Sequence, residues 1–547
     1  MCDEHNFKKL SRRQLLRLTG IASGALLIAA CDAAIRDPAI EPTPVPELET
    51  PAPADEPTPE PEPVPGEPQH GGRLRWGTTR MPDGFLDPAL AIGLPITFSN
   101  WIYEGLVGMD AQLTELVPRL ATEWHPEDGG QTWEFRLREG VRFHHGRELV
   151  ADDVVHTFER ILDPDFGSPH RVIFADITAI ETPDEHTVRF RLEGPNADFP
   201  TDTTNRGAMI VPHDLTDDEI NSQPRGTGPF RIENYANAER IVFERNDDNW
   251  REGLPYLDEL ETVTIPEATT LISSLQAGDL DAVQTVPIPL LSIVEGDPNL
   301  RLVFSPPGRR EHLFMRLDVE PFTDDRVRRA FKLIPDREAM TELVWGGVVP
   351  THLADDNPVI PGNIWHVETS IWQQDLDEAR RLLEEAGYGD GLDIDLWALN
   401  DQYGVVEFCL AFAEWAAQAG VNVNVVGVPQ DRYYAENWLE VAFGTVGWNL
   451  RPTADEQLRI QYASDAPWNE TRYQSAEFDA LLDEARAETD EERRRELYDE
   501  IQRMLITEGG QIIHALHAEA GATRQNVHGY EYHPMQFLEP HGVWLSS

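Results

Sequence analysis

The stretch DGGQTWEFRLREGVRFHHG, residues 128–146, decides the fold of this chain. Within it, Thr132–Arg138 places apolar side chains at every second position, which predicts a half-buried strand with one face in solvent. The pair Gly129-Gly130 before this strand is typical of a hairpin turn. Working outward, Gly71–Trp76 and Thr187–Leu192 repeat the same alternation. The first half of the chain is therefore expected to contain sheets with one wet face.

Helical patterns become more frequent in the second half of the chain. Apolar residues of the stretch Leu376–Ala386 recur at spacings of three and four, and Gly387 is placed to end that helix. A later helix carries the stripe Leu497–Leu505, and Thr489 with Glu492 could form a capping box before it. Strands and helices mix without an internal repeat. The pattern predicts α/β or α+β lobes.

The N-terminal segment has the features of an export signal. Residues 11–16, SRRQLL, place twin arginines before the apolar run Leu18–Ala30, which is too short to span a bilayer. The arginine pair resembles a twin-arginine signal, and the small residues before Cys31 resemble a lipobox. We expect residues 1–31 to be removed or modified there, with Cys31 lipidated and the protein held at the outer side of the cell membrane. The alternative is a plain signal peptide with an incidental cysteine.

Residues 32–70 predict a tether. Between Pro38 and Pro68 the chain is dominated by Pro, Glu, Thr, Ala and Val and has few large apolar side chains. Such a segment is expected to stay disordered, because it cannot bury enough apolar surface to offset its ordering entropy. Its prolines favour a semi-rigid, extended spacer.

Composition excludes several classes of partner and site. The 547-residue chain has 97 acidic and 45 basic residues, a formal charge of −52, which argues against binding nucleic acid or anionic lipid. The lysines are Lys8, Lys9 and Lys332. We interpret the acid excess as adaptation to a salty medium, the alternative being a GC-rich genome. Beyond Cys31 the chain has only Cys409, so an intramolecular disulfide and a cysteine zinc site are excluded there.

Further motifs accompany residues 120–146, and they occur in the order known from one protein family. They are Leu86–Ala89, Ile102–Val107, Gly226–Phe230, Gly253–Asp258 and Pro321–Phe331. Together with LATEW at residues 120–124, they resemble the signature of the peptide-type solute-binding proteins of ABC importers, extracellular solute-binding protein family 5. The similarity runs from about residue 72 to the end of the sequence.

The resemblance implies a mixed α/β (α+β) fold of two lobes that close on a ligand like a hinged clamp, as in periplasmic binding proteins. Lobe 1 would comprise residues 71–310 and 513–547, with an extra subdomain inserted at about 98–200. Lobe 2 would comprise residues 311–512, and two crossings near 310–317 and 511–516 would form the hinge. The ligand would lie buried between the lobes. The protein is expected to act as a monomer that serves a membrane permease and its ATPase.

The resemblance also points to the ligand site, around residues 443–455. Peptide binders of this family carry an aspartate three residues after the Gly-Trp pair, where it receives the peptide's amino group, but here that position is Arg451. A guanidinium cannot hold an ammonium, whereas it fits a carboxylate or phosphate. A dipeptide-binding subgroup has arginine there with an acid four residues on, which Asp455 matches. The alternative is a structural ion pair of Arg451 with Asp455 or Glu456.

Other candidates follow from the same resemblance. Trp448 would form a flat wall or pack in the core, Asn449 would hydrogen-bond ligand amides, and His170 occupies a cleft position or an ordinary surface loop. The remaining candidates lie on the same strand, on the loop after residues 394–398 and on the apolar loop 86–94. The full predicted set is Ile92, His170, Gln402, Thr445, Trp448, Asn449 and Arg451.

An enzyme is the main alternative of a different class. The sequence has no Gly-x-Ser-x-Gly elbow, no His-Glu-x-x-His helix and no P-loop. No catalytic residue, cofactor or metal is predicted; His514 and His517 could share a metal, but such an isolated pair is usually structural. The predicted function is the capture of a small solute, an oligopeptide, dipeptide or related compound. The alternatives are a sugar, opine or metal-chelate binder, and a secreted hydrolase.

Overall fold

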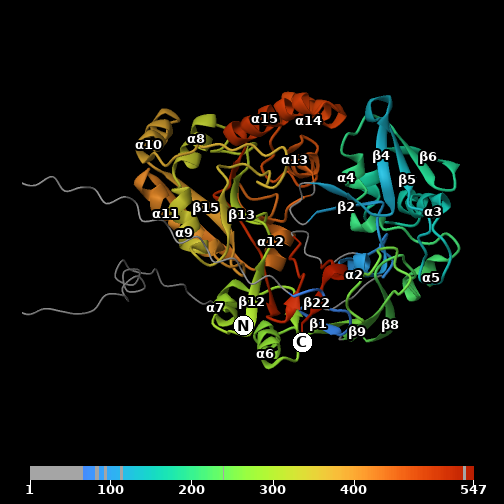
Figure 1. Cartoon of the computed structure of the whole chain (residues 1–547). Coiled ribbons are helices and arrows are strands. Elements are labelled where there is room, and N and C mark those ends of the chain that lie inside the picture. Colours follow the sequence, from blue (N-terminus) through green and yellow to red (C-terminus); the bar gives the residue numbers. More distant parts are fainter. Residues whose placement is uncertain are drawn as a thin grey trace, which may run out of the picture. The chain divides into compact units, whose positions relative to one another are not determined.

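The structure is a computed structural model that describes residues 66–80, 86–91, 95–110, 115–237, 240–451, 453–533 and 538–546 (Figure 1). The predicted export signal, Cys31, Ile92 and nearly all of the predicted tether lie outside the described residues. All the elements below belong to one unit, Pro65–Ser547. Within the described ranges, every helix is too short or too polar to cross a membrane.

A seven-stranded sheet joins segments from both ends of this unit. Its C-terminal strand β20 lies between β12 and β11, and β1 runs parallel to β10 and β11. Trp76 of β1 packs edge-on against Trp101, with ring centroids 5.6 Å apart, in the core of this sheet. In spatial order the strands are β12 (Leu300–Phe304), β20 (Ala520–Arg524), β11 (Ala282–Val283), β1 (Arg73–Thr78), β10 (Glu259–Thr264), β9 (Arg240–Arg245) and β8 (Phe230–Asn237).

A five-stranded sheet is formed by residues from the second half of the chain. β15 is parallel to β16 and β17, and β13 is antiparallel to β17 and β18. The helix α11 (Val405–Gln418) packs on β15 and β16 and buries the lone thiol of Cys409. The strands, in spatial order, are β16 (Val421–Val428), β15 (Leu392–Leu399), β17 (Phe443–Trp448), β13 (Arg310–Met315) and β18 (Gln511–Ile512).

The stretch 128–146 belongs to a separate four-stranded sheet covered by α3 (Ala151–Leu162). The predicted strand is confirmed as β5, in which Phe135 and Leu137 are buried while Arg136 is exposed. The predicted turn is also confirmed, with Gly129 at a left-handed φ of 69° that favours glycine. The strands, in spatial order, are β4 (Ala121–Glu127), β5 (Thr132–Leu137), β7 (Thr187–Leu192) and β6 (Ile177–Asp184).

The helix ends agree with the sequence in one case and differ in another. Helix α10 (Leu376–Glu385) stops just before Gly387, which has a φ of 96°. The predicted capping box of Thr489 and Glu492 is wrong. Helix α15 (Glu491–Glu508) begins one residue later, and Asp490 caps it by accepting a hydrogen bond from the backbone N–H of Arg493 at 2.9 Å.

The remaining elements connect these sheets. The two-stranded pairs are β2 (Val107–Met109) with β3 (Leu116–Pro118), β14 (Thr351–Leu353) with β19 (Ala515–His517), and β21 (Val527–His528) with β22 (Trp544–Leu545). The other helices are α2 (Pro95–Ile102), α4 (Phe199–Asp202), α5 (Asp217–Ser222), α6 (Ala268–Ala277), α7 (Leu291–Glu295), α8 (Asp325–Leu333), α9 (Arg337–Trp345), α12 (Gln430–Glu436), α13 (Ala454–Tyr462) and α14 (Ala476–Ala487). Figure 1 shows α11 beside β15, and α8 beside α10.

A buried charge network lies next to β18. The ammonium of Lys332, fully buried, donates to Asp356 Oδ2 at 2.9 Å and to the backbone oxygens of Gln511 and Ile506 at 2.7 and 3.2 Å. Arg337 holds the other oxygen of Asp356 at 2.8 Å. Buried charges are tolerated only when they are paired and hydrogen-bonded. The network therefore fixes the start of β18.

Candidate functional site

The chain passes between the two large sheets twice, and the two passages lie side by side. The first lies between β12 and β13, and the second between β18 and β20. The backbones of Arg309 and His517 exchange two hydrogen bonds, of 3.2 and 2.8 Å. This pairing brings together two residues that are 208 positions apart in the sequence.

A charged cluster occupies this double passage. It consists of Arg309, Glu311, Asn449, His517 and Glu519, which we call the crossing cluster. Glu311 accepts hydrogen bonds from Arg309 Nε at 2.9 Å, and its other oxygen lies 2.8 Å from His517 Nε2. The Nη1 of Arg309 donates to Asn449 Oδ1 at 2.8 Å and lies 4.0 Å from Glu519.

The electrostatics of the crossing cluster hold Glu311 in its charged form. Burial alone would raise the pKa of Glu311, but the charges and hydrogen bonds of Arg309 and His517 lower it to about 2. In return, the charge of Glu311 raises the pKa of Arg309. The His517 ring also stacks on Trp345, with centroids 4.0 Å apart.

Two of the predicted ligand-binding residues meet at this cluster. Asn449 is exposed and contacts Arg309, as described above. Gln402 lies against Gly447, where a Cβ would stand 3.3 Å from the Gln402 side-chain oxygen and 3.7 Å from Glu311. The amide of Gln402 donates to Gln430 at 3.3 Å. Glycine at position 447 therefore leaves room for the amide of Gln402 beside Glu311.

Arg451 and Trp448 form a second group at the end of β17. The guanidinium of Arg451 lies 5.8 Å from the centroid of Trp448, and its Nε is 3.4 Å from Glu456 Oε1. Its Nη1 contacts the oxygen of Leu450 at 3.4 Å. Asp455 is instead held by Arg459 at 3.2 Å. Of the two acids weighed as partners of Arg451, the structure pairs it with Glu456.

Trp448 is buried and shares its polar atom with an acid. Its Nε1 donates to Glu470 Oε1 at 3.1 Å, and its ring lies 5.9 Å from that of Trp468, which is 41% exposed. Burial raises the pKa of Glu470 to about 7. Trp448 thus packs in the core, whereas the neighbouring ring of Trp468 is exposed to solvent.

Two predicted residues have structural roles. Thr445 is fully buried and accepts a hydrogen bond from Leu399 N at 3.1 Å. His170 is buried rather than on the surface, since its Nε2 lies 3.1 Å from the oxygen of Ala91. A Cβ at Gly207 would stand 2.2 Å from the His170 ring, so glycine is required there. Ile92, the remaining member of the set, lies outside the described residues.

Helices α14 and α15 reach the four-stranded sheet and the segment that follows it. Arg494 donates to Asp198 at 2.5 Å, and Arg486 donates to Asp176 at 2.6 Å. The backbone N–H of Ala197 also donates to the oxygen of Arg486 at 2.8 Å. We call the pairs Asp198–Arg494 and Asp176–Arg486 the two bridging ion pairs. The former is almost fully buried, the latter partly exposed.

A surface hollow elsewhere on the protein is less suited to hold a small ligand. It has a volume of about 560 Å³ and is lined mainly by charged and polar side chains, among them Asp318, Arg328, Arg472 and Glu508. Small-molecule sites are concave and mostly apolar, with a few convergent polar groups. The hollow lacks such walls, so the candidate site is the crossing cluster with the Arg451 group. The sequence predicts none of Arg309, Glu311 and His517 at the ligand site, and it offers His517 only as a possible metal partner of His514. The predicted crossings were the available signal.

Comparison with known proteins identifies the family of this chain. The family model described as "Bacterial extracellular solute-binding proteins, family 5 Middle" matches residues 115–470. Heme-binding protein A of Haemophilus influenzae is 28% identical over 508 residues, 85% of this chain and 91% of that protein. Oligopeptide-binding protein AppA of Bacillus subtilis is 26% identical over 500 residues, which cover 86% of this chain and 91% of that protein.

The fold comparison gives the same result. The structure of HbpA2 from Haemophilus parasuis superposes with a TM-score of 0.78 at 24% identity, covering 87% of this chain and all of that one. The chain therefore has the two-lobed, mixed α/β fold of periplasmic binding proteins. The family model covers well over half of the sequence. The chain belongs to the bacterial extracellular solute-binding proteins of family 5, the extracytoplasmic substrate-binding components of ABC importers.

Proposed function

We propose that this protein captures a short peptide between its lobes and delivers it to an ABC permease and its ATPase. Its relative AppA is an oligopeptide-binding protein, which supports a peptide ligand. The single observation that carries the proposal is the loosely held guanidinium of Arg451. Its contacts with the oxygen atoms of Glu456 and Leu450 are both 3.4 Å long, so it can exchange them for a better acceptor.

The ligand group that Arg451 fits is a carboxylate. Its side chain is 24% exposed, so part of the fork-shaped guanidinium faces solvent. A planar guanidinium binds a carboxylate through two parallel hydrogen bonds, which are shorter and stronger than those to neutral groups. In a peptide without acidic side chains, the only carboxylate is the C-terminal one. We therefore propose that Arg451 receives the peptide's C-terminus, in exchange for its contact with Glu456.

The neighbouring amides suit the rest of a peptide. Gln402 lies against Gly447 and Asn449 is exposed beside Arg309, and both amides present donors and acceptors. A peptide backbone offers the complementary groups at each residue. The partly exposed ring of Trp468 can cover an apolar side chain. These groups favour a ligand with alternating polar and apolar parts.

The two bridging ion pairs are the contacts that we expect to stabilise the closed state of the lobes. Each joins α14 or α15 to the segment 176–198, and the pair Asp198–Arg494 is almost fully excluded from water. We propose that they form when the lobes close and that they hold the closed state around the ligand. The boundaries proposed for the lobes are residues 71–310 with 513–547, an insertion at about 98–200, and 311–512.

The test is a comparison of blocked and free peptides. The purified protein is first analysed by native mass spectrometry for copurified ligand, and a peptide of the size found is then titrated calorimetrically. A C-terminally amidated peptide should bind at least about tenfold more weakly than the free acid, the range of a lost charged hydrogen bond. N-acetylation should have the smaller effect. Equal affinity for the amide and the acid would reject the carboxylate role. Hemin, the ligand class in the name of a relative, is the non-peptide comparison.

We also propose binding without turnover and attachment by a lipid. The peptide should be recovered intact from the complex, which a hydrolase would not allow. Residues 1–31 are proposed to direct twin-arginine export, with Cys31 as the lipid attachment site and the protein acting as a monomer. Cell fractionation tests the anchor, since Cys31→Ser should release the protein from the membrane fraction. The export signal is tested by the double substitution Arg12→Lys and Arg13→Lys, which should block export.

A further inference from the structure

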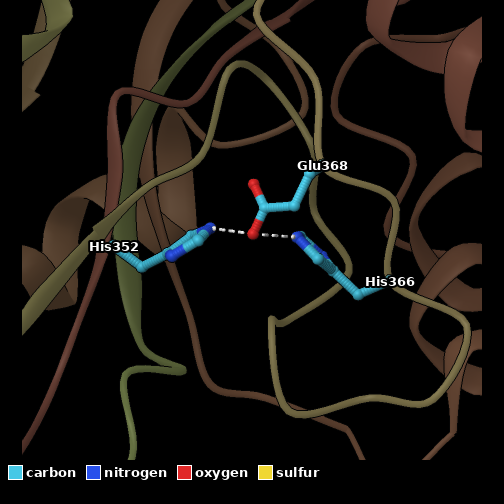
Figure 2. Close-up of side chains that lie close together, drawn as sticks. All are labelled: His352, His366 and Glu368. Atoms are coloured by element: carbon cyan, nitrogen blue, oxygen red, sulfur yellow. Dashed lines mark ion pairs between the residues drawn. The ribbon is translucent and has the colours of Figure 1, made fainter.

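Two histidines and a glutamate meet beside β19, the strand that carries His517 of the crossing cluster, because Thr351 and His352 of β14 pair with His517 and Leu516. His352 belongs to β14, whereas His366 and Glu368 lie on the segment that leads from β14 toward α10. In Figure 2 the two imidazole rings point toward the same carboxylate from opposite sides. One atom from each of the three side chains lies within 4.8 Å of the others.

The separations fit metal ligands better than hydrogen bonds. Glu368 Oε1 lies 3.4 Å from His352 Nε2 and 3.5 Å from His366 Nε2. Hydrogen bonds between nitrogen and oxygen are about 2.7–3.2 Å long. Ligand atoms about 2.0–2.2 Å from a tetrahedral zinc ion lie roughly 3.3–3.5 Å from one another. The distances from Glu368 Oε1 to the two histidine nitrogens therefore match the distance expected between two ligands of a tetrahedral zinc ion.

The ring hydrogen of His366 is on Nδ1, which leaves the lone pair of Nε2 facing Glu368. Its Nδ1 lies 2.8 Å from the backbone oxygen of Val359, which can only accept, so Nδ1 carries the hydrogen. A neutral ring then presents the lone pair of Nε2. The side chain is 8% exposed, and within the described residues its Nε2 has no hydrogen-bond partner. A buried lone pair that faces a carboxylate is unfavourable unless a cation lies between them.

His352 is in the same state. Its Nε2 is likewise buried without a hydrogen-bond partner among the described residues. Each ring therefore presents to Glu368 a nitrogen that is free to bind a metal ion.

The segment that carries Glu368 is held on both sides. The N–H of Val367 donates to Gln502 at 3.2 Å, and the hydroxyl of Thr369 donates to Asp355 at 2.6 Å. Glu368 itself is 71% exposed, so its carboxylate can adjust to an ion. A hydrogen bond donated by the far nitrogen of His366, together with a fixed backbone, is the usual support of a metal site.

We propose that His352, His366 and Glu368 bind one divalent transition-metal ion, with Zn²⁺ as the best fit and a further position open to water. Two imidazoles and one carboxylate suit zinc, whereas magnesium and calcium prefer sites made of oxygen atoms alone. The ion would tie β14 to the segment 366–368. The proposal is independent of which solute the lobes bind.

The experiment measures zinc on the mature protein. The protein is purified without a histidine tag, stripped with a chelator and titrated calorimetrically with Zn²⁺ in excess Mg²⁺, which occupies the acidic surface. One equivalent of Zn²⁺ is expected to bind. His366→Ala and Glu368→Gln should each weaken binding at least about tenfold, the lower end of the loss for weakened metal sites. Substituted Co²⁺ should give the visible absorption of a four-coordinate site.

The control is another histidine next to a glutamate. His125 lies 3.7 Å from Glu123, and both side chains are largely exposed, at 69% and 63%. His125→Ala should leave zinc binding unchanged. If the wild-type protein binds no stoichiometric zinc, or if His125→Ala loses as much affinity as His366→Ala, the proposal is overturned. Circular dichroism of each variant shows whether it is folded, and Glu368→Gln, an exposed change, retains the test if His366→Ala does not fold.

Discussion

The Nε of Arg451 lies 3.4 Å from Glu456 Oε1. The acid one position earlier, Asp455, is engaged by Arg459 at a spacing of i to i+4 within α13. The two acids of this first turn therefore have different partners. If Arg451 binds the ligand as proposed, only Glu456 competes with the ligand for it.

This competition predicts opposite effects for two substitutions. Arg451→Ala should weaken peptide binding at least about tenfold, because a charged hydrogen bond to the carboxylate is lost. Glu456→Gln should leave affinity unchanged or raise it, because the guanidinium is then released. Titration calorimetry with one peptide on both variants measures this, and Asp455→Asn is the matched control. Equal losses in all three variants would show a general structural effect.

The bridging ion pair Asp198–Arg494 should affect closure. Asp198→Asn leaves the buried guanidinium of Arg494 without its charge partner, and breaking a buried pair costs about 3–5 kcal/mol. We expect weaker ligand binding and a larger radius of gyration with ligand present, measured by small-angle X-ray scattering. Arg493→Ala is the control, since Arg493 is exposed and pairs with Glu484 of α14 and with Glu496 of its own helix α15. An unchanged radius for Asp198→Asn would contradict the role in closure.

Glu311 should make stability fall in acid. Its pKa in the folded protein is about 2, below the ordinary value of 4.5, so the folded state favours the charged form. This contribution is complete above pH 4.5 and is lost as the pH falls toward 2. Its size is about 3 kcal/mol, at roughly 1.4 kcal/mol per pKa unit. Urea unfolding should show Glu311→Gln less stable than wild type at pH 6, and the gap should narrow toward pH 2. A gap independent of pH would refute the assignment.

Glu470 should have the opposite dependence. Burial raises its pKa from 4.5 to about 7, so its contribution is favourable below pH 4.5 and is lost as the pH rises through 7. Glu470→Gln keeps an oxygen for the Trp448 N–H but cannot ionise. The variant should be more stable than wild type at pH 8, by up to about 3 kcal/mol, and about equal at pH 4. The exposed change Glu139→Gln should show no such crossover in the same urea series.

Salt should stabilise the whole protein. A formal charge of −52 makes the folded chain repel itself, and salt screens that repulsion over about 10 Å at 0.1 M and about 3 Å at 1 M. The melting temperature should therefore rise between low and molar NaCl. Sucrose of matched osmolality is the control, because it does not screen charge. A melting temperature that stays constant as NaCl is raised would contradict salt adaptation as the cause of the acid excess.

The sequence predicted the elements whose signals are local. The strand at Thr132 and the turn at Gly129 depend on neighbouring residues, and both are confirmed. The cap of α15 also depends on neighbours, but two candidate caps stand side by side, and the backbone begins its helix after Asp490. A one-residue choice of this kind is decided by tertiary packing.

The parts of the site that were missed depend on distant contacts. His170 is buried because residues near Ala91 and Gly207 close around it, and neither segment is near it in the sequence. The crossing cluster joins Arg309 to His517, which only the completed fold brings together. Asp455 offered a local signal, since Arg459 stands four residues later on the same helix.

The buried Lys332 has a practical consequence. It is the last of three lysines in the sequence, and the other two lie at positions 8 and 9. In a mature chain that starts at Cys31, its amine is the sole lysine amine, and it is enclosed by Asp356 and two backbone oxygens. An amine-reactive dye cannot reach it until the protein opens, so the rate of labelling at this side chain measures how often the second lobe unfolds.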